Sequence, residues 1–185
     1  MSILAAITEA YALLPDAFNS DRATLLLLAI QRQEDPELLR YQRVKRVAST
    51  LPDNVVDANW AKGPARGAWQ FEQGGAVNSL LGHRATWKTA RDLCAERGVL
   101  FSAGAIWRAL EHDDVLAAGF ARLLLWSDPK PLPLAGDEQG AFDLYLRTWR
   151  PGAYHRGTPE QKSALRQKFH AHYANALDQL TQALA

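Results

Sequence analysis

The residue best suited to acid–base chemistry is Glu34, which ends an apolar segment. It follows Ile30 by four residues and Leu27 by seven, so on a helix its carboxyl group projects from the same side as an apolar face. The last turn of a helix carries partial negative charge, which disfavours a second negative charge there. Burial and the helix dipole both raise the pKa of this carboxyl group, so we expect an acid able to protonate a leaving oxygen. An exposed carboxylate that merely ends a helix is the alternative.

A second segment, from Gly63 to Glu72, has the composition of a sugar-binding surface. Its glycines allow the backbone to approach a ligand closely. Trp69 and Phe71 offer flat apolar surface, and the amide of Gln70 can both donate and accept hydrogen bonds. A structural turn with aromatic residues in the core has the same composition, so both interpretations stay open from spacing alone.

Together, these segments resemble the lysozyme-like lytic transglycosylases of phages and prophages. Residues 29–34 (AIQRQE) are similar to the apolar helix that ends in the catalytic glutamate of that family. Residues 67–70 (GAWQ) are similar to the second half of its Gly-Ala-x-Gly-Leu-Met-Gln segment. Residues 142–149 (FDLYLRTW) resemble a later Tyr-Asn-Ala-Gly segment, with Tyr145 in the place of a tyrosine that approaches the cleft. The resemblance covers roughly residues 23–152.

The resemblance implies an enzyme that cleaves the glycosidic bond between N-acetylmuramic acid and N-acetylglucosamine in peptidoglycan, without a cofactor or a metal. In a transglycosylase, Glu34 alone would protonate the leaving oxygen and then deprotonate the muramic acid 6-hydroxyl to close a 1,6-anhydro ring. In a hydrolase, a second carboxylate would activate water. Glu34 should then line a groove shared with Gln70 and Tyr145. The residues that the resemblance assigns to substrate binding are Arg66, Gly67, Trp69, Gln70, Phe71 and Tyr145.

Three carboxylates are candidates for the second acid: Asp35, Asp57 and Glu72. We favour Glu72 because it belongs to the motif segment, although a salt bridge to a nearby arginine would explain it equally well. Asp35 stands where the family has a serine after its glutamate. By comparison with the family, residues 41–62 would be an insertion over or beside the cleft. Trp69 replaces a methionine of the family pattern, and the asparagine after the tyrosine is missing.

Hydrophobic residues recur with the period of a helix, and strict alternation is nearly absent. This pattern predicts an all-α, lysozyme-like fold with about seven to nine helices and little or no sheet. The length predicts one domain over residues 1–185. Asp35 and Pro36 predict the start of a charged helix through Lys45, and residues 50–62 are expected to form an exposed excursion. The expected helices cover residues 2–14, 20–34, 36–45, 76–81, 87–97, 102–110, 113–126, 137–149 and 158–183.

The long C-terminal helix over residues 158–183 has the clearest start. Thr158, Pro159 and Gln161 have the pattern of a capping box with proline at the first helical position. Its apolar stripe is expected to pack onto the core, with a dimer seam as the alternative.

Composition and charge exclude several classes of function. The chain has 185 residues, and 48% of them are hydrophobic, which is too apolar for a disordered protein. A net charge of +1 leaves no general basic field for nucleic acid or an anionic membrane, so any polyanion would have to meet a local patch. The lone Cys94 is expected to be a small buried hydrophobe, and the histidines lack metal-ligand spacing. One cluster of cations, interpreted as a solvated helix face, comprises Arg40, Arg43, Lys45 and Arg46.

Location and partners follow from the termini and from the resemblance. The apolar runs are too short to span a bilayer, so we expect no membrane insertion. No basic segment precedes the apolar N-terminus, so no secretory signal is expected. The resemblance implies synthesis in the host bacterial cytoplasm. Action in the periplasm or cell wall would follow release through a holin, as for an endolysin, or delivery in a virion with other phage proteins. Peptidoglycan strands are the expected partner, and a monomer is expected.

A function of a different class stays open at this point. A non-catalytic phage structural or assembly protein would have the same fold, because fold does not dictate function. The residues around Glu34 and Gln70 depart from the family pattern, so this alternative stays open. A DNA-binding helical protein is disfavoured by the near-neutral charge and by the lack of a basic recognition helix.

Overall fold

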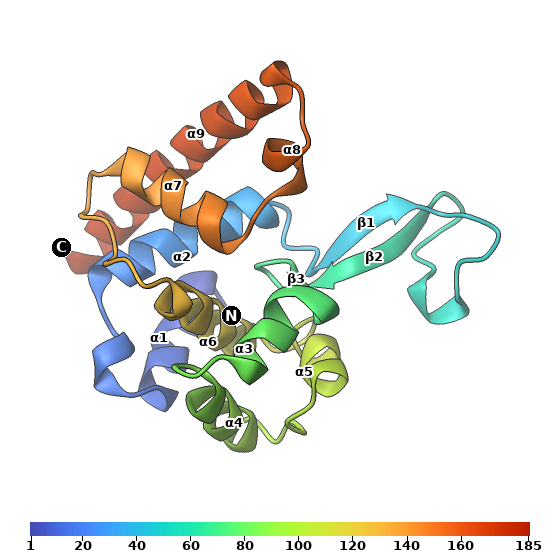
Figure 1. The fold of residues 1–185 in the computed structure, drawn as a ribbon, viewed down its shortest axis with the longest axis horizontal. Helices are drawn as coiled ribbons and strands as arrows, with labels where there is room; N and C mark the ends of the chain where they lie inside the picture. The colour runs from blue at the N-terminus through green and yellow to red at the C-terminus, as the bar shows by residue number, and fades with distance from the viewer.

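The computed structural model describes residues 1–152 and 154–185. Helices dominate it, and one small sheet projects from them (Figure 1). A mostly helical fold was predicted and is confirmed, while the three-stranded sheet corrects the expectation of an all-α chain. Within the described residues, no helix combines the length and the apolar character needed to cross a membrane. The helices are α1 (Ile3–Leu13), α2 (Asp21–Glu34), α3 (Asn78–Gly82), α4 (Trp87–Glu96), α5 (Ala103–Ala109), α6 (Asp114–Ser127), α7 (Glu138–Thr148), α8 (Gly152–His155) and α9 (Pro159–Leu184).

Helix α6 is the most deeply buried element of the core. Every residue from Val115 to Leu125 is buried, and α1, α2, α3 and α4 all contact this helix. Helix α2 buries Leu25 to Ile30 and makes its most extensive contacts with α9. The stripe on α9 packs onto the core through Phe169 and Tyr173, as predicted. The end of α2 is therefore held between α9 and the rest of the core.

Side-chain caps fix where α2 and α9 begin. The Ser20 hydroxyl accepts a hydrogen bond from the Ala23 N–H at 3.2 Å and starts α2. Thr158 opens α9 with the predicted capping box, in which Gln161 is the second partner. Helix α2 ends at Glu34, the position expected for the acid.

Residues 36–45 do not form the predicted charged helix. The Asp35 carboxylate instead accepts hydrogen bonds from the N–H groups of Leu39 and Arg40, at 3.0 and 2.7 Å. Leu38 and Arg40 adopt left-handed backbone conformations, with φ of 53° and 61°, which a right-handed helix excludes. The chain turns here and enters the sheet.

The sheet has three antiparallel strands in the order β1-β2-β3: β1 (Tyr41–Lys45), β2 (Trp60–Arg66) and β3 (Phe71–Glu72). Arg43 pairs with Lys62 and Lys45 pairs with Trp60 in the register of β1 with β2. The β1–β2 hairpin projects away from the helical body (Figure 1). The exposed excursion predicted for residues 50–62 is confirmed as far as Asn59, after which β2 begins.

Candidate active site

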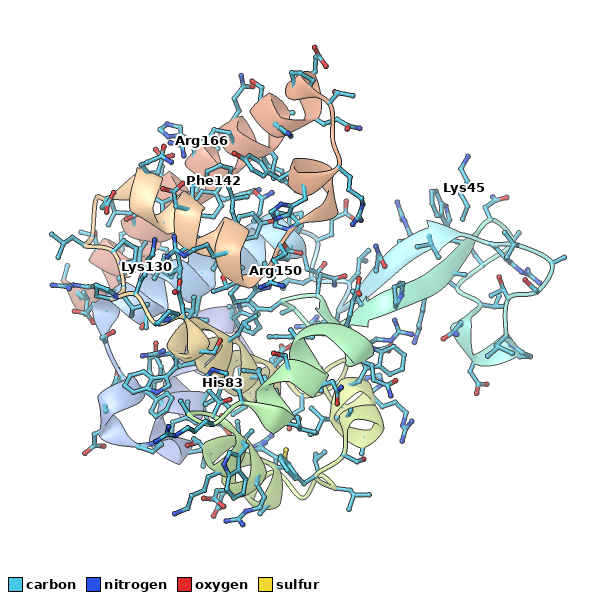
Figure 2. The ribbon with its side chains drawn as sticks, viewed as in Figure 1. Lys45, His83, Lys130, Phe142, Arg150 and Arg166 are labelled. Carbon is cyan, nitrogen blue, oxygen red and sulfur yellow. The ribbon has the colours of Figure 1, made fainter. Side chains whose placement is uncertain are left out.

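A groove of about 1260 Å³ brings together residues from distant parts of the chain. Glu34 comes from the end of α2, Gln70 from the turn between β2 and β3, and Tyr145 from α7. Lys130 and Arg150, both labelled in Figure 2, line the same groove. The sequence predicts that Glu34, Gln70 and Tyr145 share a groove, and the structure confirms this placement.

The carboxyl group of Glu34 is half-buried and accepts a hydrogen bond from the Tyr145 hydroxyl, with 2.6 Å between the two oxygens. Its pKa rises to about 7, chiefly because burial penalises the charged form. The Tyr145 hydrogen bond and the positive charge of Lys168 lower this pKa, while the negative charge of Asp35 raises it. Glu34 therefore exchanges its proton near neutral pH, as a general acid and base must.

Aromatic packing holds Tyr145 in place. Its ring stacks on Phe169 with the centroids 5.3 Å apart, and it lies 6.2 Å from the ring of Phe142. Burial raises the pKa of its hydroxyl, so the group stays protonated and donates to Glu34. Gln33, which also lines the groove, is buried, and its side-chain oxygen has no hydrogen-bond partner in the described part of the chain.

Trp69 is a core residue, which corrects its assignment as a sugar-binding surface. Its ring is fully buried, and its indole N–H donates to the Leu27 carbonyl of α2 at 2.9 Å. The indole N–H of Trp149 donates in turn to the Trp69 carbonyl at 3.0 Å. These bonds tie the turn around Trp69 to α2 and to the end of α7. Trp69 therefore positions the groove without lining it.

Arg66 and Gly67 also lie outside the groove lining, contrary to the expectation. The Arg66 guanidinium is buried, pairs with Glu111 at 2.8 Å and stacks over the Trp107 ring at 4.3 Å. Gly67 has a φ of 76°, and a Cβ atom there would lie 2.8 Å from the Leu110 carbonyl oxygen. Both residues anchor β2 against α5 and the turn that follows it.

Gln70 and Phe71 do line the groove. Gln70 has a left-handed φ of 54°, which is uncommon for a residue with a side chain. Its side-chain Nε2 donates to the Gly67 carbonyl at 3.1 Å. Such strain is concentrated at functional sites, where the surrounding structure maintains it. Phe71 is buried and packs 6.1 Å from the Trp149 ring, so it adds only an apolar edge to the groove.

Of the three candidates for a second acid, only Glu72 lines the groove. It is exposed and has no ion-pair partner among the residues described, so the salt-bridge explanation does not apply. Asp35 binds backbone N–H groups of the turn that follows α2. Asp57 binds those of Asn59 and Trp60, at 2.7 and 3.0 Å. Asp35 and Asp57 therefore have structural roles.

No family model, no curated protein and no solved structure matches this chain. The chemistry of the groove has to be inferred from its own residues, and its electrostatics include a feature that the sequence did not reveal.

Four exposed cations line the groove and have no carboxylate partner in the described part of the chain. We call them the cationic wall: Lys130, Arg150, Arg156 and Lys168. Arg147 also lines the groove but pairs with Asp128 at 2.8 Å. In the described part of the chain, only two carboxylates that line the groove lack an ion-pair partner, Glu34 and Glu72. The groove is therefore positively charged although the whole chain has a net charge of only +1. The wall comes from separate loops and from α9, so no local motif signals it.

The structure also bears on metals and on the single thiol. Among the described residues, no group of three or more His, Cys, Asp or Glu side chains is arranged to hold a metal ion. Cys94 is buried, as predicted, and burial raises the pKa of its thiol to about 12. A thiol with this pKa stays protonated at neutral pH, which fits a packing role.

Proposed function

We propose that this protein is a lysozyme-like glycosidase that cleaves the bond between N-acetylmuramic acid and N-acetylglucosamine in peptidoglycan. The observation that carries the proposal is Glu34, half-buried at the end of α2 with a pKa of about 7 and bonded to Tyr145. The groove exceeds the volume of most small-molecule pockets, which suits a polymer. The end of α2 at Glu34 also supports the proposal, because the resemblance is to an apolar helix that ends in the catalytic glutamate.

The hydrogen bond from Tyr145 assigns different roles to the two carboxyl oxygens of Glu34. Tyr145 donates to Oε1, so the acidic proton is carried by Oε2. Glu34 gives this proton to the glycosidic oxygen as the bond from C1 to that oxygen breaks. In a transglycosylase, the resulting carboxylate takes the proton of the muramic acid 6-hydroxyl while O6 bonds to C1. No water is consumed, and Glu34 ends in its protonated form.

Glu72 offers the hydrolytic alternative. As an exposed carboxylate of the same groove, it would activate a water molecule or stabilise the positive charge at C1. The two reactions differ in their products, because the 1,6-anhydro product is lighter by one water than the hydrolysis product. The mass of the products therefore assigns the reaction.

The cationic wall favours an anionic glycan over a neutral one. Peptidoglycan carries carboxylates on its stem peptides, or on the lactyl group where no peptide is attached, whereas chitin carries none. Four unpaired cations along one groove attract such a strand and orient it, and this attraction weakens with salt.

The sequence resemblance extends the proposal to a phage or prophage origin. The protein would be made in the bacterial host and would reach the cell wall after release through a holin or as part of a virion.

The test is to digest purified sacculi from several bacteria with the wild type, Glu34→Gln and Glu72→Gln, and to weigh the soluble products. Loss of the acid should reduce release about 10²- to 10⁴-fold. Glu72→Gln is the matched control, since it should leave release unchanged if the products are 1,6-anhydro sugars. If the folded wild type releases nothing, the proposal is wrong, and a non-catalytic phage structural or assembly protein becomes the better explanation.

A further inference from the structure

The end of the β1–β2 hairpin exposes aliphatic side chains far from the core. Residues 46–59, which we call the arm tip, connect β1 to β2. Leu51 is 67% exposed, Val47 60% and Val56 36%. The hairpin projects from the helical body, so no other element of the fold covers them (Figure 1). Exposed aliphatic residues gathered in one projecting loop indicate a contact surface.

The arm tip has its own hydrogen bonds. The Arg46 N–H donates to the Asn59 carbonyl at 2.8 Å, and the Thr50 N–H donates to the Val47 carbonyl at 3.0 Å. The Thr50 hydroxyl accepts from the Val47 N–H at 3.1 Å, and the Asp57 carboxylate accepts from the Asn59 N–H at 2.7 Å. The aliphatic side chains are therefore presented by a formed loop.

Positive charge lies beside the apolar residues. Arg43, Lys45 and Arg46 are exposed and have no carboxylate partner among the described residues, and Lys45 points away from the body in Figure 2. The Arg43 guanidinium lies 4.6 Å from the centroid of the Trp60 ring. The acidic residues of the arm tip are Asp53, which is exposed, and Asp57, which binds backbone N–H groups. Along the arm, the apolar tip thus borders a band in which the cations and the Trp60 ring lie together.

We propose that the arm tip docks this protein onto an anionic lipid surface. In such a contact, aliphatic side chains enter the boundary between the headgroups and the acyl chains, and lysine and arginine contact lipid phosphates. Tryptophan is enriched at the level of the headgroups. An anionic glycan or a nucleic acid would account for the cations but not for the aliphatic tip. A second copy of the chain would account for the tip but would bring the same cations together across a symmetric contact.

The arm tip and the groove are separate surfaces. Gln42 lines the groove, and Arg43 and Lys45 lie on the opposite face of β1 because successive side chains of a strand alternate. This local patch also fits the net charge of +1, which leaves no general attraction to membranes. Docking through the arm tip is peripheral and is compatible with the absence of a membrane-spanning helix among the described residues.

The experiment is co-sedimentation of the full chain with vesicles of phosphatidylcholine alone or mixed with phosphatidylglycerol. The wild type should bind the mixed vesicles, and removing two of the three cations in Lys45→Gln/Arg46→Gln should weaken binding about fivefold for each charge. Val47→Ser/Leu51→Ser should lose binding to the same vesicles. Leu100→Ser is the matched control, because Leu100 is 74% exposed but lies outside the arm, and it should bind like the wild type.

Three results would overturn the proposal. They are no binding of the wild type to mixed vesicles, equal binding of the arm-tip variants, and a wild-type dimer in ultracentrifugation that Val47→Ser/Leu51→Ser dissociates. Vesicle binding does not involve Glu34, so it is measured independently of glycosidase activity.

Discussion

Replacing Glu34 with glutamine should stabilise the protein above neutral pH while it removes the proposed activity. The Glu34 pKa is raised from 4.5 to about 7, so the folded chain binds this proton more tightly than the unfolded chain does. Stability therefore falls as the pH rises from about 4.5 to about 7, and it stays at the lower level above that range. Glutamine does not ionise and still accepts the Tyr145 hydrogen bond, so the variant escapes this loss.

The size of the effect follows from the same interval. From 4.5 to about 7, at about 1.4 kcal/mol for each pH unit, the loss amounts to about 3 kcal/mol. Water in the groove screens the half-buried carboxylate, so we expect about 2 kcal/mol of this loss to be measured. For a domain of this length, that corresponds to a melting temperature about 4–8 °C higher than that of the wild type.

Urea denaturation of both proteins at pH 4.5 and pH 8.5 measures the difference. The variant and the wild type should be close in stability at the lower pH and about 2 kcal/mol apart at the higher pH. Glu72→Gln, which removes an exposed carboxylate of the same groove, should change stability little at either pH. A Glu34→Gln variant that is no more stable than the wild type at pH 8.5 would refute the reasoning.

Four further predictions concern activity and packing. The rate of sacculus digestion should fall about tenfold per pH unit above the Glu34 pKa of about 7, and a rate that holds to pH 9 would exclude Glu34 as the acid. Tyr145→Phe removes a hydrogen bond that lowers the Glu34 pKa, so the pH–rate curve should shift to higher pH and the rate should fall about tenfold; an unchanged curve would contradict this. Gly67→Ala should lose more than about 1 kcal/mol in urea denaturation because of its positive φ, and a wild-type midpoint would count against the clash. Arg150→Gln/Arg156→Gln should raise KM for peptide-bearing strands about fivefold and leave kcat unchanged, and high salt should abolish this difference from the wild type. Equal KM values of the variant and the wild type at low salt would exclude the cationic wall from substrate binding.

Features set by neighbouring residues were predictable from the sequence. Ser20 caps the start of α2, and Pro36 ends the helix because the residue before a proline is disfavoured in helical backbone; both lie next to the helix. The capping box of α9 is equally local. The burial of Glu34 follows from the spacing of its apolar neighbours on the helix. Its pKa of about 7 agrees with the expected rise.

Features set by distant contacts were not predictable. Trp69 is buried because it bonds to Leu27 and Trp149, which are 42 and 80 residues away. The residues of the cationic wall are separated by loops and follow no helical or strand period. The helix predicted from Pro36 fails for another reason, because the Asp35 carboxylate caps a turn through Leu39 and Arg40 and directs the chain into β1.

The bonds of Trp69 also bear on the turnover of the glycosidase that we propose. Through Leu27 and Trp149, this one residue links the helix that carries the acid to the helix that carries its tyrosine. The two partners are thus connected through one turn, and their oxygens lie 2.6 Å apart. Cleavage would then need no lobe closure to assemble the proton donor.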